Sequence, residues 1–145
     1  MPKTFITLIA ALVLTGLTMA SPAQAEQKVV NGEYEIHYIV FPTTFLRPSI
    51  AAQYDLPRGK NRALVNVSVL EAGKPVKANV AGSSRNLLEQ RQSLEFREVD
   101  EGNAVYYLAL ISHADEENHR VEIQVDLPNG KVQDINFVQK MYWEE

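Results

Sequence analysis

The sequence contains no cysteine among its 145 residues, and this absence excludes several kinds of protein. No disulfide can cross-link the fold, no thiolate can act as a nucleophile, and no lipidated cysteine can anchor the chain in a membrane. Zinc sites built on cysteine are excluded as well. We therefore expect a soluble fold that is stabilised by its apolar core alone.

The sequence also lacks an excess of positive charge. It carries 14 basic and 18 acidic side chains, for a net charge of −4. A mildly acidic surface argues against nucleic acid or an anionic membrane as the main partner. No repeat, low-complexity tract or linker divides the chain.

The first 25 residues follow the pattern of a secretory signal peptide. One lysine precedes an apolar run from Phe5 to Ala20, and Ala23-Gln24-Ala25 provides small residues for cleavage. The run is shorter than the roughly 20 residues that span a bilayer. We therefore expect cleavage of residues 1–25, export to a bacterial periplasm without a membrane anchor, and a single domain over residues 26–145.

Alternation of apolar and polar residues predicts strands along most of that domain. The predicted strands cover residues 33–41, 63–70, 76–82, 94–99, 104–111, 120–127 and 132–143. The strand at 104–111 is apolar on both faces, so we expect it to be covered on both sides. Seven strands without alternating long helices predict an antiparallel immunoglobulin-like β-sandwich.

Two connections between these strands carry distinct signals. Pro48 favours the start of one short helix that reaches Tyr54, because proline suits the first helical turn. Residues 83–92 break the alternation, and we interpret them as a loop or a single helical turn held in place by Leu87 and Leu88.

The stretch from Phe41 to Leu70 carries the most local information, and its loop is the best candidate interaction segment. Binding residues gather in loops, and this loop places apolar side chains around a proline turn beside a basic patch. The basic patch could also bind an anion, because its glycine offers backbone N–H groups beside cations. It could equally protect a strand edge, which needs no ligand. The candidate residues are Phe45, Leu46, Ile50, Tyr54, Arg58, Lys60 and Arg62.

Nothing in the sequence predicts an enzyme or a cofactor. It has no G-x-S-x-G elbow, and a strand places Glu95 and Glu98 on opposite faces rather than across a cleft. The three histidines, His37, His113 and His119, could hold copper or zinc, but their spacing matches no zinc signature. We expect solvated loop histidines without a metal.

The six tyrosines and one tryptophan could form a platform that stacks on a sugar or a peptide. Tyrosine that alternates along a strand is more often a core residue with its hydroxyl at the rim. We expect the core arrangement.

Five segments of the chain together resemble a bacterial family of exported Gram-negative proteins, the domain of unknown function 4426. They are YEIHYIVFPTTFL, AAQYDLPRGKNRALVNVSVL, NLLEQRQ, LEFREVDEGNAVYYLAL and FVQKMYW, and the similarity extends from Gly32 to Trp143. The resemblance implies an exported all-β domain and supplies no catalytic or ligand residues.

Two classes of function remain open. The first is a non-enzymatic interaction module that binds a periplasmic or envelope protein through the segment from Phe41 to Arg62. The alternative is a periplasmic carrier of a small ligand, an anion or a metal that uses the basic loop or the histidines.

Overall fold

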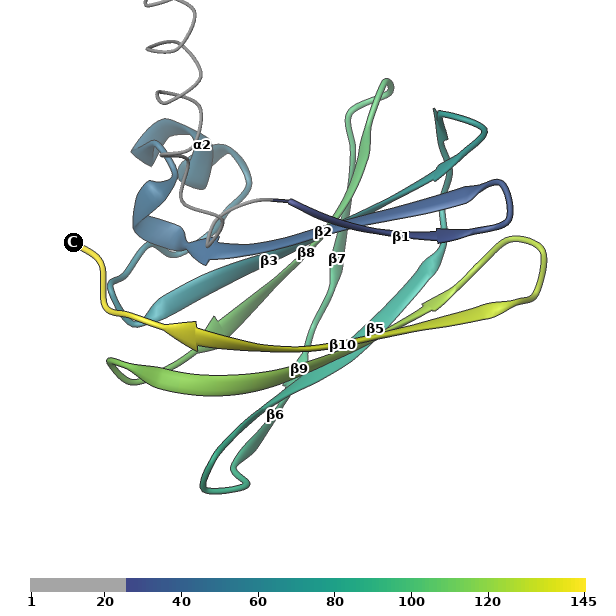
Figure 1. Cartoon of the computed structure of the whole chain (residues 1–145). Coiled ribbons are helices and arrows are strands. Elements are labelled where there is room, and N and C mark those ends of the chain that lie inside the picture. Colours follow the sequence, from purple (N-terminus) through teal and green to yellow (C-terminus); the bar gives the residue numbers. More distant parts are fainter. Residues whose placement is uncertain (1–25) are drawn as a thin grey trace, which may run out of the picture.

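The protein, seen here in a computed structural model that describes residues 26–145, folds into two antiparallel sheets packed face to face (Figure 1). The first sheet runs in the order β1 (Gln27–Asn31), β2 (Tyr34–Pro42), β3 (Arg62–Glu71), β8 (Val105–Ser112) and β7 (Arg97–Asp100), with β4 (Lys74–Pro75) also paired to β3. The second runs β10 (Val132–Met141), β9 (Glu117–Asp126), β5 (Asn79–Asn86) and β6 (Arg91–Leu94). The antiparallel sandwich predicted from the alternation is confirmed.

The core lies between the sheets and is built from every second side chain of the strands. In β9, Val121, Ile123 and Val125 are fully buried and point inward, while the residues between them are exposed. Tyr38 of the first sheet stacks on Phe137 of the second, with ring centroids 5.2 Å apart. The period of two in the sequence thus determines which side chains are removed from water.

The chain between β2 and β3 covers the outer face of the first sheet. It contains the turn η3 (Thr43–Phe45) and the helix α2 (Pro48–Gln53). Arg97 of β7 donates a hydrogen bond to the carbonyl of Tyr54, so this segment crosses from β2 past β3 and β8 before it returns. Leu108 of β8 is buried outside the central core cluster, which confirms that this strand is covered on its outer side as well.

Residues 83–86 and 91–92 form strands instead of the predicted loop or helical turn, which is confined to residues 87–90. Ser83 to Asn86 continue β5 and pair with β9, and Ser83 to Arg85 also pair with β6. Leu87 and Leu88 do not hold the segment against the core, because both side chains project into solvent. The alternation of apolar and polar residues does not appear in this part of the sequence, because the inward-facing residues Ser84 and Asn86 are polar. Both are buried and form hydrogen bonds.

Other boundaries also differ from the predictions. The predicted strand 94–99 is divided, because β6 ends at Leu94 in the second sheet and β7 begins at Arg97 in the first. β10 ends at Met141 rather than at residue 143. β1 was not predicted at all, although Gly32, the first of the two residues that join it to β2, has a positive φ and is a hairpin signal at that position.

Candidate functional site

The buried side chain of Thr43 forms hydrogen bonds that hold the predicted interaction segment in place. The Thr43 hydroxyl accepts a hydrogen bond from the Gly59 N–H at 3.0 Å. It donates toward the Gly59 and Arg62 carbonyls, at 3.0 and 3.2 Å. Because Thr43 is fully buried, these contacts fix η3 against the basic loop.

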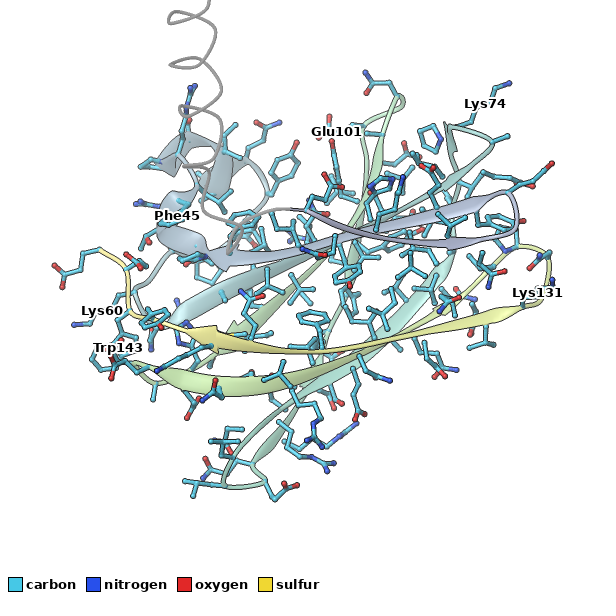
Figure 2. The ribbon with its side chains drawn as sticks, viewed as in Figure 1. Phe45, Lys60, Lys74, Glu101, Lys131 and Trp143 are labelled. Atoms are coloured by element: carbon cyan, nitrogen blue, oxygen red, sulfur yellow. The ribbon has the colours of Figure 1, made fainter. Side chains whose placement is uncertain are left out.

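The basic loop is engaged by the protein itself at two of its three cations. The Arg58 guanidinium donates to the Thr44 carbonyl at 3.0 Å. The Lys60 ammonium lies 4.8 Å from the centre of the Trp143 ring and 3.9 Å from a Glu145 carboxylate oxygen. Figure 2 places Lys60 and Trp143 together at one end of the sandwich.

The C-terminal tail is held at the same place by hydrogen bonds between side chains and backbone. The Trp143 indole N–H donates to the His113 carbonyl at 3.2 Å, and the Trp143 backbone N–H donates to Asp115 at 2.9 Å. The His113 N–H in turn donates to the Asn61 carbonyl at 3.0 Å. The tail, the connection between β8 and β9, and the basic loop therefore form one surface.

This surface, together with η3 and α2 that precede the basic loop in the chain, exposes several large apolar side chains. We call it the loop–tail surface and define it as Phe45, Ile50, Lys60, Tyr142 and Trp143. The exposed fractions of Phe45, Ile50, Tyr142 and Trp143 are 49, 37, 45 and 44%. The sequence predicted Phe45, Ile50 and Lys60 as interaction residues but not the two aromatic residues of the tail, because the last strand was expected to include them.

The other predicted residues of the segment serve the fold. Leu46 and Arg62 are half-buried. The Tyr54 hydroxyl donates a hydrogen bond to the Glu101 carboxylate. This hydrogen bond is the main cause of the raised pKa of the Tyr54 phenol, and burial is the second cause. Tyr54 therefore ties the end of α2 to the hairpin between β7 and β8.

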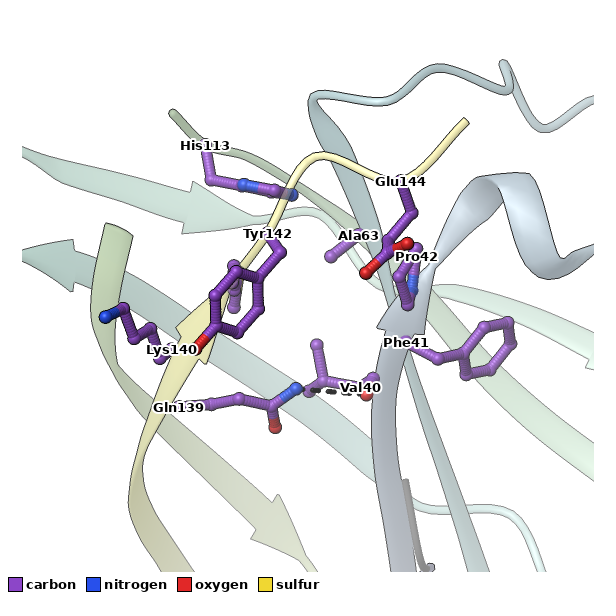
Figure 3. A pocket seen from close by; sticks show the side chains of 10 residues that line it. Val40, Phe41, Pro42, Ala63, His113, Gln139, Lys140, Tyr142 and Glu144 are labelled. Carbon is purple, nitrogen blue, oxygen red and sulfur yellow. Dashed lines mark hydrogen bonds between the residues drawn. The ribbon is translucent and has the colours of Figure 1, made fainter. Parts of the chain in front are cut away.

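A small pocket lies beside the loop–tail surface, between the end of β2 and the end of β10 (Figure 3). Gln139 crosses its floor and donates to the Val40 carbonyl at 3.1 Å. Its volume is about 100 Å³, whereas pockets for drug-sized ligands measure about 300–1,000 Å³. The pocket can accept a single side chain of a partner but not a larger ligand. Its lining residues include Phe41, Pro42, Ala63, His113, Met141 and Tyr142.

Two of the three histidines are buried, which corrects the expectation of solvated loop residues. The exposed fractions of His113 and His119 are 7 and 2%. β9 begins at Glu117, three residues earlier than predicted, so His119 lies in the strand and points inward. His37 is half-buried, with 23% of its side chain exposed, and its ring contacts the carboxylates of Glu26 and Glu35 at 3.1 and 3.2 Å.

His119 links a serine to a carboxylate in a hydrogen-bonded chain. Its Nδ1 lies 2.6 Å from the Ser84 hydroxyl, and its Nε2 lies 2.5 Å from Glu117. Burial raises the pKa of Glu117, but hydrogen bonds from His119 and the Ala114 N–H outweigh it, so the net pKa is lowered. The groups match those of a hydrolase triad, yet Ser84 has no exposed surface, so a substrate has no route to its hydroxyl.

Three of the six tyrosines follow the expected core arrangement, whereas Tyr142 is 45% exposed. Tyr34 and Tyr107 are buried, and Tyr38 packs against the core. The Tyr107 hydroxyl donates to Glu98 and accepts from the Ala78 N–H, both at 2.9 Å. The hydroxyl thus finds its partners at the rim of the core.

Two further features of residues 26–145 bear on function. Neither of their helical segments has the length and apolar character needed to cross a bilayer. Among these residues, no group of three or more histidine, aspartate or glutamate side chains is arranged to hold a metal ion. The predicted signal peptide, residues 1–25, lies outside the described residues.

Solved structures include similar chains. A DUF4426 family protein from Pseudomonas aeruginosa is 35% identical, with a TM-score of 0.74 over 83% of this chain and 97% of that one. A copper-bound variant of FetP from uropathogenic Escherichia coli is 15% identical, with a TM-score of 0.61 over 83% of this chain and 97% of that one. FetP expressed in the periplasm of E. coli is also 15% identical, with a TM-score of 0.59 over 84% and 97%. The FetP structures share the fold alone.

Sequence comparison leads to the same family. No curated protein matches the chain significantly. The family model for the domain of unknown function DUF4426 matches residues 28–144, nearly all of the chain that the structure describes. The protein therefore belongs to the DUF4426 family.

Proposed function

We propose that the protein is an exported, non-enzymatic interaction module that binds a protein partner through the loop–tail surface. The observation that carries the proposal is the exposure of Trp143, which its hydrogen bonds hold beside Lys60, with Phe45 also exposed on η3. Tryptophan is enriched among the residues that dominate binding energy, and a fixed anchor loses little entropy on binding. The adjacent pocket offers room for one apolar side chain of the partner.

Photo-crosslinking in intact cells tests this proposal. A crosslinking amino acid replaces Phe45 or Trp143 in separate strains, and Lys131 serves as the control because it lies in the hairpin between β9 and β10. We expect the first two positions to capture the same protein, with little capture from Lys131. Failure of both positions to give a reproducible product, or equal capture from Lys131, would count against the proposal.

We propose that the module is located in the periplasm. The support is the sequence of residues 1–25, with its apolar run and its Ala23-Gln24-Ala25 site. Export predicts a processed protein that begins at Glu26 and is released by osmotic shock. N-terminal sequencing of the released protein tests this, and an intact N-terminus in the cytosolic fraction would contradict it.

The alternative function, a carrier of a small ligand, an anion or a metal, has weaker support. Arg58 and Lys60 of the basic loop already contact Thr44 and Trp143, which leaves Arg62 as the one cation of that loop without such a side-chain contact among the described residues. A FetP variant, whose fold is similar, is copper-bound, and His37 is the least buried of the three imidazoles of this chain. Calorimetric titration with copper, zinc and phosphate tests the alternative, and the absence of heat at micromolar protein would remove it.

A further inference from the structure

The hairpin between β5 and β6 carries the most exposed apolar side chains of residues 26–145. Leu87 and Leu88, at its tip, are each 78% exposed. The hairpin projects from the sandwich at the bottom of Figure 1, whereas α2 lies at the upper left. The two leucines therefore belong to a surface distinct from the loop–tail surface.

The tip is rigid. The Asn86 side-chain oxygen accepts hydrogen bonds from the Leu88 and Gln90 N–H groups, each at 3.0 Å. The Asn86 amide also donates to the Gln90 side chain at 2.7 Å, and the Asn86 N–H donates to the Gln90 carbonyl at 3.1 Å. The backbone thus holds both leucines in water, although exposing them is unfavourable.

Three arginines stand side by side immediately behind the tip. Arg85 of β5 is the register partner of Arg91 in β6 and of Arg120 in β9, so all three project from the same face of the second sheet. Like charges opposite one another destabilise a sheet. Arg85 pairs with Glu89 at 3.2 Å, and Arg91 reaches only Ser93, at 3.5 Å. Among the described residues, the Arg120 guanidinium has no hydrogen bond or ion pair, so the row is incompletely neutralised.

The apolar side chains lie at the tip and the cations lie behind it, in the same order as the acyl chains and the phosphates of a bilayer surface. Arg85 precedes Leu87 by two residues, which is roughly 7 Å along an extended chain. Apolar groups of interfacial segments penetrate about 5–10 Å into the boundary between headgroups and acyl chains. When the leucines reach that boundary, the guanidinium groups lie at the level of the phosphates, which arginine binds with two parallel hydrogen bonds.

We propose that this tip, defined as Leu87, Leu88, Arg85, Arg91 and Arg120, docks on a bilayer that contains anionic lipid. A protruding tip needs a deep groove on a protein partner, whereas a fluid bilayer accommodates it without a preformed cavity. The net charge of −4 does not oppose docking, because salt screens charges beyond about 8–10 Å and the local row dominates. Binding is reversible and salt-sensitive, since two leucines form a small apolar anchor.

Vesicle sedimentation tests the proposal. The protein is purified in the processed form that cells produce, and vesicles contain equal parts phosphatidylcholine and phosphatidylglycerol or phosphatidylcholine alone. We expect binding to the anionic vesicles and little to the neutral ones. Leu87→Ser combined with Leu88→Ser should lower the partition coefficient at least about tenfold, because both apolar anchors are lost. Arg120→Gln should lower it about fivefold and flatten its dependence on salt.

Matched controls distinguish docking from general effects of the substitutions. Val30→Ser removes an exposed apolar side chain of β1, and Lys74→Gln removes an exposed cation of β4. Both should leave binding unchanged, and unchanged thermal unfolding of the tip variants shows that they remain folded. Equal binding by the leucine variant and the parent protein would overturn the proposal. Absence of vesicle binding, with protein crosslinks formed from Leu88, would also overturn it and assign the tip to a protein partner.

Discussion

At the scale of single residues, the buried chain of Ser84, His119 and Glu117 replaces apolar packing at one end of the core. Burial of such groups is costly unless each polar atom finds a partner. Here both ring nitrogens of His119 are engaged, and Glu117 also accepts hydrogen bonds from the Ala114 N–H and the Asn86 amide. The chain thereby connects β5, β9 and the turn that precedes β9.

The lowered pKa of Glu117 predicts a dependence of stability on pH. Because its carboxylate is favoured in the folded state, it stabilises the protein above its ordinary pKa of 4.5, and this stabilisation is lost as pH falls through the lower folded pKa. We expect Glu117→Gln to lower the free energy of unfolding by about 1–3 kcal/mol at neutral pH and by less in acid. Urea unfolding between neutral pH and pH 3 measures this.

The neighbouring Glu116 provides the control for that measurement. Its side chain is exposed and makes no contact with His119, so Glu116→Gln should change the free energy of unfolding little at any pH. If the free energy of unfolding changed with pH in the same way for Glu117→Gln and for the parent protein, the carboxylate of Glu117 would not be the source of this stabilisation.

Lys60 is the residue that joins the tail to the loop, and its removal should loosen the tail. Trp143 is the sole tryptophan, so its fluorescence reports directly on this contact. We expect Lys60→Met to increase acrylamide quenching while lowering the free energy of unfolding by less than about 1 kcal/mol, because exposed cation–π contacts are weak. Lys74→Met is the matched control. Unchanged quenching in Lys60→Met would mean that the hydrogen bonds of Trp143 hold the tail in place without the contact to Lys60.

At the scale of elements, β5 determines how tightly the second sheet packs. Gly82 pairs with Ile123 of β9 and Leu94 of β6. A Cβ at position 82 would approach the Glu122 carbonyl oxygen to 2.6 Å and a Phe96 ring carbon to 3.3 Å. Glycine is needed here for close approach and not for an unusual backbone angle.

Substitution at this position should therefore be costly. We expect Gly82→Ala to lower the free energy of unfolding by about 1–3 kcal/mol, as overpacking of a dense core does. Ala81→Ser changes the adjacent, outward-facing side chain and should be nearly neutral. Denaturant unfolding of both variants measures the difference, and a neutral Gly82→Ala would indicate that β9 shifts at little cost.

At the scale of the whole molecule, stability rests on the layer between the sheets because no cysteine is present to reinforce it. Ile111 is completely buried, whereas Val132 is 50% exposed. We expect Ile111→Ala to lower the free energy of unfolding by about 2–5 kcal/mol and Val132→Ala by less than about 0.5 kcal/mol. Thermal and urea unfolding measure both, and similar losses would indicate that the core is loosely packed.

The sequence alone determined much of this architecture. Alternation in residues 63–70 and 120–127 marked strands whose inward faces are buried, as the structure confirms. The proline at position 48 marked the helix, and the loop around it includes Phe45, Ile50 and Lys60 of the loop–tail surface. These features are local, because side chains alternate across a strand and proline fixes its own backbone angle.

Tertiary structure decided what local patterns do not encode. The polar strand at 83–86 forms because β6 and β9 flank it, and the chain at Glu95-Phe96 changes sheets where the sequence continues to alternate. His119 is buried because partners from other elements surround it, and Trp143 meets Lys60 across 83 positions of chain. Such contacts depend on segments far apart in sequence, so only the folded chain brings these groups together.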